Sequence, residues 1–272
     1  MFASIIGIEG GMGEWLVKHL GALGFEVVGY DERRGDDTRV LAKSDLVVVS
    51  VPIGATAGVI KNVAGYMSEG STLVEIASLK SGVYEALIEA SKLGLVTLSI
   101  HPMFGPSATS LEDKTIALVP VSEVESEVKR AKHLFPGASI IPTDLETHDR
   151  SMSLILSLPY LINIALAGTL KEEDLLLLRR LAGTSFTLQY VLVQSISAEK
   201  SGLIHALLSE NRFLREYVDR FVDNISLILE ALDSNEQFDE VHNDIQMSMR
   251  MDKLHGNASE IRQSVYEFIK KV

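Results

Sequence analysis

Glycine and proline are distributed unevenly along the 272-residue sequence, and this asymmetry constrains the fold more than any other feature. Of the 20 glycines, 16 lie before residue 151, as do six of the seven prolines. Both residues interrupt regular elements, so the first half should hold many short elements and the second half a few long ones. We therefore predict two domains, residues 1–148 and residues 149–272.

Short apolar runs alternate with helical stretches in the first half. Continuous Val, Ile and Leu runs are typical of parallel strands that are covered by helices on both faces. The expected strands are Ala3–Ile8, Phe25–Tyr30, Leu46–Val51, Thr72–Glu75, Leu95–Ile100 and Thr115–Val119. This pattern predicts an α/β domain with a parallel-rich, doubly wound sheet.

The second half is predicted to be all-α. Its expected helices are Asp149–Leu170, Glu172–Ser195, Ala198–Ser209, Glu210–Leu232, Phe238–His255 and Ala258–Lys271. The apolar runs Leu175–Leu178 and Tyr190–Val193 are too wide for a lone surface helix. We expect these faces to pack against one another or against a second subunit, which predicts a dimerisation domain and a homodimer. A monomeric helical cap is the alternative.

Composition and charge exclude several classes of function. The net charge of −12, with no run of Lys and Arg, argues against nucleic acid and anionic membranes as partners. The absence of cysteine excludes disulfides and thiolate chemistry, and the seven scattered histidines indicate no metal site. The longest apolar stretch, Leu154–Ala167, is interrupted by Ser157, Pro159 and Asn163, so no membrane span is expected. A strand that starts at Ala3 leaves no room for a signal peptide, which predicts a cytoplasmic protein.

A glycine-rich loop follows the first expected strand and opens a helix over Glu14–Leu23. Free N–H groups and the dipole at a helix N-terminus attract a diphosphate, and glycines let the backbone approach it. The spacing departs from G-x-G-x-x-G because Ile8 stands at a usual glycine position. A Rossmann-type dinucleotide site is therefore predicted at Gly7, Ile8, Glu9, Gly10, Gly11, Met12 and Gly13.

Asp31 follows the second expected strand, 18 residues after Gly13. An acid at that point can accept both ribose hydroxyls of NAD and repel the 2′-phosphate of NADP. Arg33 and Arg34 come next and could hold that phosphate, so we expect NAD with NADP as the alternative. The turn after the third strand should pack beside the nucleotide through Val51, Pro52 and Thr56, although a simple strand-to-helix connection explains them equally well.

The segment Ile100-His101-Pro102-Met103-Phe104-Gly105-Pro106 places one histidine at the end of a strand. Its prolines stiffen the following loop, and Gly105 permits a sharp turn. Ligands of open α/β sheets lie beyond the carboxyl ends of the strands, so His101 is well placed for chemistry. Ser78 and Lys80 follow another strand and should lie on the same rim. The alternative is a turn with an incidental histidine.

The sequence resembles the prephenate and arogenate dehydrogenases of tyrosine biosynthesis, and the likeness covers nearly the whole chain. Four segments carry it: Ile5–Gly13, Val49–Ile53 with Thr56, Ser78–Lys80, and His101–Pro106. The first loop, with Trp15 just beyond it, is most similar to archaeal prephenate dehydrogenases. The resemblance implies NAD-dependent oxidative decarboxylation of prephenate to 4-hydroxyphenylpyruvate and CO₂. His101 would then act on the substrate hydroxyl, Ser78 would orient it, and Lys80 would hold the loop or bind substrate charge.

Two positions depart from the family pattern. Tyr160 follows Leu158-Pro159 where many bacterial relatives have a histidine, and Thr187 aligns with their carboxylate-binding arginine. Tyr160 can still donate a hydrogen bond to substrate, and a dianionic substrate still needs a cation. We rank Arg250 first because methionines flank it on a helix expected to be buried; the other candidates are Arg150, Arg179, Arg180, Lys200 and Arg212. His148, His205 and His255 are expected to be packed or exposed rather than catalytic.

Three further readings compete with NAD-dependent prephenate oxidation. Arogenate is the near variant of the substrate. Another two-domain dehydrogenase, such as a β-hydroxyacid dehydrogenase or a pyrroline-carboxylate or deazaflavin-linked reductase, would explain the architecture but not the His101 loop. A nucleotide-sensing dimer without catalysis would explain Thr187, although it leaves Ser78 and His101 without a role.

Overall fold

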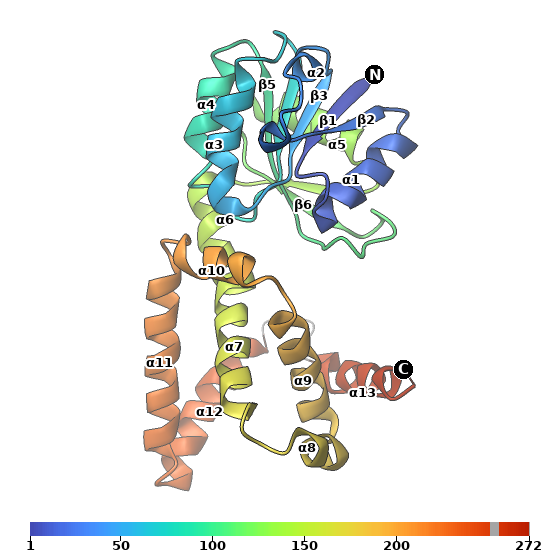
Figure 1. Cartoon of the computed structure of the whole chain (residues 1–272). Helices are drawn as coiled ribbons and strands as arrows, with labels where there is room; N and C mark the ends of the chain where they lie inside the picture. The colour runs from blue at the N-terminus through green and yellow to red at the C-terminus, as the bar shows by residue number, and fades with distance from the viewer. Residues whose placement is uncertain (251–255, 272) are drawn as a thin grey trace. The chain divides into compact units, whose positions relative to one another are not determined.

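The computed structural model describes residues 1–250 and 256–271, and the chain divides into two compact units (Figure 1). The first unit comprises Met1–Ser153 and His205–Asn211, and the second comprises Leu154–Ile204 and Arg212–Val272. The first stretch thus runs five residues past the limit at residue 148 expected from the sequence. A short segment from the second half of the sequence also belongs to the first unit.

A seven-stranded sheet in the order β2-β1-β3-β4-β5-β6-β7 forms the centre of the first unit. Strands β1 to β5 are parallel to their neighbours, β6 is antiparallel to β5, and β7 is parallel to β6. The strands are β1 (Phe2–Ile6), β2 (Glu26–Tyr30), β3 (Leu46–Val49), β4 (Thr72–Glu75), β5 (Val96–Pro102), β6 (Thr115–Leu118) and β7 (Ser139–Pro142). The predicted doubly wound, parallel-rich α/β fold is confirmed.

The sheet has an apolar core on each face because successive side chains of a strand point to opposite sides. In β3, Leu46 and Val48 belong to one core, whereas Val47 and Val49 belong to the other. Helices α1 and α5 cover the first core, and α2, α3 and α4 cover the second. The helices of this unit are α1 (Gly11–Ala22), α2 (Arg39–Ala42), α3 (Ile53–Ala64), α4 (Tyr84–Ser91), α5 (Val124–Leu134) and α6 (Leu145–Met152), with a 3-10 turn η1 (Glu32–Arg34).

Strand β7 is the one strand of the described sheet that the sequence pattern did not predict. It has four residues, only Ile140 is buried, and it ends at Pro142, which cannot donate to a neighbouring strand. Proline and exposed side chains are tolerated at a sheet edge, where β7 lies. This short strand therefore lacks the apolar run that revealed the other six strands.

The second unit is helical and contains more interruptions than expected. Its helices are α7 (Leu158–Leu170), α8 (Leu175–Leu181), α9 (Thr184–Ser197), α10 (Ser201–Ser209, shared with the first unit), α11 (Leu214–Ala231), α12 (Asn235–Met249) and α13 (Ala258–Ile269). A single helix over 172–195 was predicted, but Gly183 is extended, with φ −89° and ψ −167°, and separates α8 from α9. Helix α9 packs against both α7 and α13.

The predicted helix over 149–170 is continuous but irregular. It starts at Leu145 as α6, widens into the π-helical turn η2 (Ser153–Ser157), and continues as α7. Pro159 lies in the first turn of α7, where its missing N–H costs little. By length and composition alone, Leu145–Leu170 could also cross a membrane, which was not expected. A single apolar helix of this kind is weak support for a span, because the core helices of soluble proteins share these properties.

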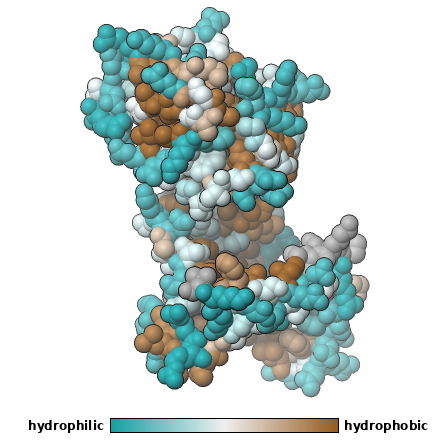
Figure 2. All heavy atoms as spheres, turned by 90° about the vertical axis from the view of Figure 1, so that its right-hand side faces the viewer, coloured by the Kyte–Doolittle hydropathy of each residue, from teal (hydrophilic) through white to brown (hydrophobic). Residues whose placement is uncertain are grey.

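Large apolar side chains reach the surface of the helical unit, as the brown residues in the lower part of Figure 2 show. Leu176 and Leu181 are 73% and 74% exposed. The expectation that α12 is buried is wrong for the single chain: none of its described residues is buried, and Met247 and Met249 are exposed. His255, at the predicted end of this helix, lies outside the described residues.

Candidate active site

The loop between β1 and α1 has a backbone that side chains would obstruct. Gly7 has a φ of +86°, a conformation that favours glycine. A Cβ on Gly7 would lie 2.1 Å from the carbonyl oxygen of Ser50, and a Cβ on Gly13 would lie 2.2 Å from the carbonyl oxygen of Gly7. Gly10 and Gly11 begin α1, whose positive dipole end faces this cradle. These residues fit a dinucleotide diphosphate, which needs close approach to backbone N–H groups.

Ile8, at a position usually held by glycine, is accommodated by a glycine elsewhere. A Cβ on Gly29 of β2 would lie 2.7 Å from Ile8 Cγ2, so the Ile8 side chain occupies the space above Gly29. Gly29 interrupts the run Phe25–Tyr30, and this was the sequence signal for the compensation. The glycine loop can therefore keep its backbone conformation although Ile8 stands where a glycine is usual. Of the remaining loop residues, Met12 is partly buried and Glu9 is exposed.

Charged side chains surround the residue that should meet the adenosine ribose. Asp31, just after β2, accepts hydrogen bonds from Arg33 Nε at 3.1 Å and Arg33 Nη2 at 2.9 Å. These bonds lower the pKa of Asp31, which therefore stays ionised. Arg34 contacts Glu9 at 2.9 Å and Asp36 at 3.1 Å. Both the acid and the two arginines that the sequence offered are thus at the end of β2.

The turn after β3 lies against the glycine loop. Val51 Cγ1 is 3.2 Å from the position that a Cβ on Gly7 would take, and Pro52 is the N-cap of α3. Thr56 is buried, and its hydroxyl donates to the Pro52 carbonyl at 3.2 Å. Thr56 therefore stabilises the turn itself, and its expected role beside the nucleotide stays a prediction.

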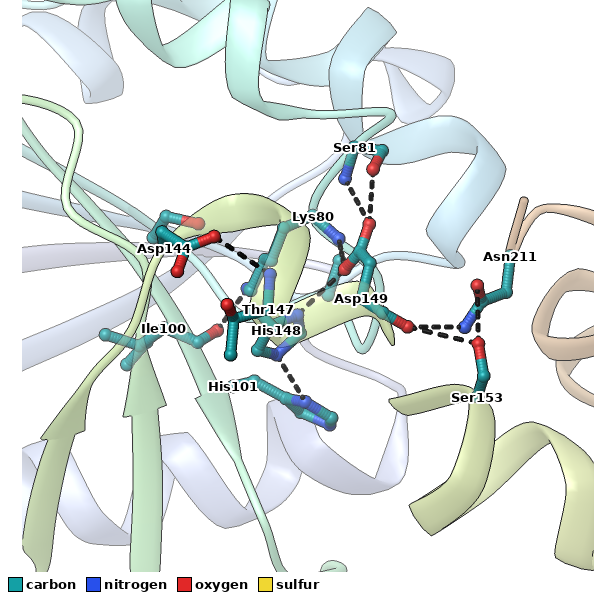
Figure 3. A network of polar contacts seen from close by, with 12 residues as sticks. Lys80, Ser81, Ile100, His101, Asp144, Thr147, His148, Asp149, Ser153 and Asn211 are labelled. Carbon is teal, nitrogen blue, oxygen red and sulfur yellow. Dashed lines mark hydrogen bonds and ion pairs between the residues drawn. The ribbon is translucent and has the colours of Figure 1, made fainter. Parts of the chain in front are cut away.

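His101 lies near the end of β5 (Figure 3). Its side chain is buried, with 5% of its surface exposed. Its Nδ1 is 3.2 Å from Nε2 of His148, and Nδ1 of His148 is 2.8 Å from Oδ1 of Asp149. Helix α6 supplies both partners, and Asp144 caps that helix by accepting the Thr147 N–H. His148 is buried, and the sequence did not reveal its contact with His101.

The order of these contacts determines which nitrogen of each neutral imidazole carries the proton. Asp149 is ionised: burial alone would raise its pKa, but hydrogen bonds from His148, Ser81 and the backbone lower it to about 2. The carboxylate therefore requires a proton on His148 Nδ1, which leaves His148 Nε2 as an acceptor. His101 must then donate from Nδ1, and its Nε2 carries a lone pair.

Burial lowers the pKa of His101 well below its usual range, and the positive charge of Lys80 lowers it further, against the opposing effect of Asp149. The imidazole is therefore neutral at physiological pH. A neutral imidazole with an unprotonated Nε2 is a general base or a strong hydrogen-bond acceptor.

Asp149 also anchors the segment that follows β4. It accepts the backbone N–H of Lys80 at 2.9 Å and that of Ser81 at 2.8 Å, and the Ser81 hydroxyl at 2.5 Å. Its own carbonyl accepts the Asn211 side chain at 2.9 Å. One carboxylate therefore orients His148 and fixes the loop that bears Ser78.

Lys80 was expected either to hold the loop or to bind substrate charge, and its contacts are with protein groups. Its side chain is fully buried, and Nζ lies 2.7 Å from Glu75 Oε1 and 2.6 Å from the Ile100 carbonyl. Ser99 donates to the same carboxylate oxygen at 2.5 Å. The ammonium thus ties the end of β4 to the residue before His101, an arrangement that favours a positioning role over contact with substrate.

The loop after His101 contacts the nucleotide loop. Trp15 of α1 donates its indole N–H to the Ala108 carbonyl at 2.7 Å, and its ring meets Phe104 edge-on at 5.2 Å. A Cβ on Gly11 would lie 3.0 Å from Pro106. Ser78 is half-buried at the bend after β4, the strand next to β5. The structure thus brings the glycine loop, Ser78 and His101 together at the carboxyl ends of the parallel strands β1, β4 and β5.

Tyr160 and Arg250 belong to the helical unit, and their roles at the substrate stay predictions. Tyr160 is half-buried, and burial together with Glu199 raises the pKa of its phenol, which remains a hydrogen-bond donor. Arg250 is exposed and donates to Gln246 Oε1 at 2.6 Å. Within residues 1–250 and 256–271, no group of three His, Asp or Glu side chains could hold a metal ion.

A doubly wound domain with this cradle, followed by a helical domain, is the architecture of two-domain, dinucleotide-dependent dehydrogenases. Matches to family profiles show which family of dehydrogenases this is. Residues 22–147 match the nucleotide-binding domain of prephenate dehydrogenase, and residues 144–247 match the dimerization domain of the same enzyme. The chain belongs to the prephenate dehydrogenase family, as its resemblance in sequence predicted.

Several relatives share most of this chain. It is 30% identical over 256 residues to a probable arogenate/prephenate dehydrogenase of Methanocaldococcus jannaschii, which covers 86% of this chain and 57% of the relative. It is 28% identical to the T-protein of Enterobacter agglomerans, over 82% of this chain and 61% of the relative. The chain therefore spans about three fifths of the length of these relatives.

Solved structures share the fold. Prephenate dehydrogenase from Aquifex aeolicus, in complex with hydroxyphenyl propionate and NAD⁺, has a TM-score of 0.71 and 20% identity, and the likeness covers 93% of this chain and 98% of that one. Synechocystis arogenate dehydrogenase has a TM-score of 0.64 and 20% identity, over 96% of this chain and 100% of that one. Both relatives therefore share the fold of this chain.

Proposed function

We propose that this protein oxidises and decarboxylates prephenate with NAD, yielding 4-hydroxyphenylpyruvate and CO₂. The observation that carries the proposal is the hydrogen-bonded series His101–His148–Asp149, which leaves a neutral imidazole nitrogen free at the edge that holds the glycine cradle. Family membership supports the reaction class. The NAD⁺ and hydroxyphenyl propionate bound by the Aquifex relative support the choice of cofactor and of an aromatic product.

The reaction needs an acceptor for the hydroxyl proton of the substrate. Bound NAD supplies the acceptor for the hydride on ring carbon C4. His101 Nε2 holds the hydroxyl proton while the C4–O bond gains double-bond character and that hydride leaves. The bond from C1 to its carboxylate then breaks, its electrons complete the aromatic ring, and CO₂ departs. The proton returns to the phenolic oxygen, so the buried imidazole ends neutral.

Four other side chains have proposed roles in this site. Ser78, at the bend after β4, orients the substrate hydroxyl or the His101 ring. Tyr160 donates a hydrogen bond to substrate, and Arg250 neutralises one of its carboxylates, because a buried carboxylate without a partner is costly. Lys80 acts through His101, since its ammonium is already bonded to Glu75 and Ile100.

Arogenate is the second candidate substrate. Its ring carries the same groups as prephenate and differs in an amino group on the side chain, so the same His101 chemistry applies. The name of the Methanocaldococcus relative includes both activities, which favours testing both.

The proposal is tested by offering the purified protein prephenate or arogenate, each with NAD⁺ or NADP⁺, and following the absorbance of the reduced nicotinamide. We expect turnover with prephenate and NAD⁺. Turnover with arogenate alone would move the assignment to the second candidate. Binding of NAD⁺ without turnover of either substrate would contradict catalysis and favour a nucleotide-sensing protein or a different substrate.

We also propose that the protein is a homodimer in the cytoplasm. The profile match to a dimerization domain and the exposed apolar side chains of α8 and α9, including Leu176, Leu181 and Leu192, support a second copy as the partner. Light scattering should give the molar mass of two chains. A mass of one 29.8 kDa chain at micromolar concentration would contradict the dimer.

A further inference from the structure

An ion pair joins the glycine-rich loop to the segment that follows β2. Arg34 Nη1 lies 2.9 Å from Oε1 of Glu9, and the two residues are 25 positions apart in the sequence. The other terminal nitrogen, Nη2, lies 3.1 Å from Oδ2 of Asp36. The guanidinium of Arg34 therefore lies between two carboxylates, one of which belongs to the cradle itself.

This network surrounds the position that distinguishes NAD from NADP. In doubly wound folds the acid after the second strand holds the ribose 2′-hydroxyl of NAD, whereas an arginine nearby accommodates the 2′-phosphate of NADP. Here the Asp31 carboxylate accepts two hydrogen bonds from the Arg33 guanidinium. The backbone N–H of Asp31 donates to the Asp36 carboxylate at 2.8 Å. Both arginines that could hold a 2′-phosphate are thus bonded to carboxylates.

The balance of charge around this position is negative. Three carboxylates, those of Glu9, Asp31 and Asp36, face two guanidinium groups in the described contacts. A phosphate entering here would have to displace a carboxylate from an arginine and would be repelled by the carboxylates that remain. A ribose hydroxyl has no such cost, because it can donate to Asp31.

We propose that Glu9 determines dinucleotide specificity by pairing with Arg34 and so keeping its guanidinium from a 2′-phosphate. This inference rests on the proposed use of a nicotinamide dinucleotide. Glu9 of the glycine loop and Asp31 after β2 would then both contribute to the exclusion of NADP. The Glu9 side chain is 82% exposed, so its replacement should leave the fold intact.

The test compares Glu9→Gln, Arg34→Gln and the double variant with the wild type, by calorimetric titration with NAD⁺ and with NADP⁺. Glu9→Gln should raise the affinity for NADP⁺ relative to that for NAD⁺ about tenfold, the worth of one charge-assisted hydrogen bond. Because the gain acts through Arg34, the double variant should lose it. Arg34→Gln alone should bind NADP⁺ no better than the wild type.

Asp37→Asn is the matched control. Asp37 pairs with Arg39 in the same acidic segment, and the substitution removes the same single negative charge. We expect its affinity for both dinucleotides to equal that of the wild type. An equal gain in NADP⁺ affinity for Asp37→Asn would mean that general charge is responsible, and the proposal would be wrong.

The remaining outcomes separate this inference from the function on which it rests. Binding of NAD⁺ by the wild type, with an unchanged NADP⁺ affinity in Glu9→Gln or a gain that persists in the double variant, would overturn the role of the Glu9–Arg34 pair alone. A wild type that prefers NADP⁺ would also overturn it. A wild type that binds neither dinucleotide would refute the proposed function as well.

Discussion

Replacing His101 with asparagine should lower kcat by about 10²–10⁴-fold and leave the affinity for NAD⁺ unchanged. The amide of asparagine can still donate a hydrogen bond to Nε2 of His148, which His101 Nδ1 contacts at 3.2 Å, so the local structure should persist. The amide cannot accept a proton at neutral pH, and the substrate hydroxyl would lose its acceptor. Initial rates with prephenate and NAD⁺, together with calorimetric titration of NAD⁺, measure the two effects separately.

His133→Asn is a suitable control because His133 is an exposed histidine on α5 of the same unit. We expect its rate to equal that of the wild type. Retention of the full rate in His101→Asn would show that the imidazole has no part in the chemistry. A variant that keeps the full rate must also be folded, because turnover requires the native fold.

The pH profile gives a second measure of the His101 assignment. The base acts in its neutral form, and burial together with neighbouring positive charge lowers the pKa of His101 well below its usual range. The acid limb of kcat/KM, which reports the free enzyme, should therefore lie below the pH at which an ordinary histidine titrates. An acid limb at or above that pH would contradict a base buried in this network.

Replacing Lys80 with methionine should destabilise the protein by about 3–5 kcal/mol, because it leaves the buried Glu75 carboxylate without its cation. Glu75 would keep hydrogen bonds from Ser99 and from the Ala77 N–H, but these do not neutralise its charge. Urea unfolding followed by circular dichroism measures the change. Adding Glu75→Gln should restore part of the stability, because the double variant buries no unpaired charge.

The surface pair Lys61–Glu89, at 3.3 Å and more than half exposed, is the matched comparison. Lys61→Met should change the free energy of unfolding by no more than about 0.5 kcal/mol, since water screens an exposed pair. If Lys80→Met left stability unchanged and raised KM for prephenate, the ammonium would contact substrate, which is the second of the two roles expected for Lys80. Loss of stability would support its placement between β4 and β5.

Much of the first unit could be predicted because its signals are local. Six of the seven strands were predicted to within two residues at each end, since continuous runs of Val, Ile and Leu are typical of strands covered on both faces. The glycine loop was recognisable because a backbone that passes 2.1 Å from a would-be Cβ admits no other residue. The helices of the second unit were harder to delimit, because a single glycine such as Gly183 is a weak signal for a helix end within a long apolar sequence.

The polar contacts of the site depend on residues that are distant in sequence. His148 is 47 positions from His101, and Asp149 is 69 positions from Lys80. Nothing in the sequence near His148 distinguishes a packed histidine from one that orients a catalytic base. Lys80 was equally ambiguous, because a lysine after a strand can face a ligand or a buried carboxylate.

By itself, the sequence determined the fold class, the glycine cradle, the histidine at the end of β5 and the family, because each depends on residue types at short and regular spacings. The tertiary structure alone decided which partners those residues meet: His148 and Asp149 behind His101, the Ile100 carbonyl beside Lys80, and Glu9 beside Arg34. The physical reason is that burial, charge neutralisation and the protonation of an imidazole depend on distances in space. Those distances exist only after strands and helices from separate parts of the chain have packed together.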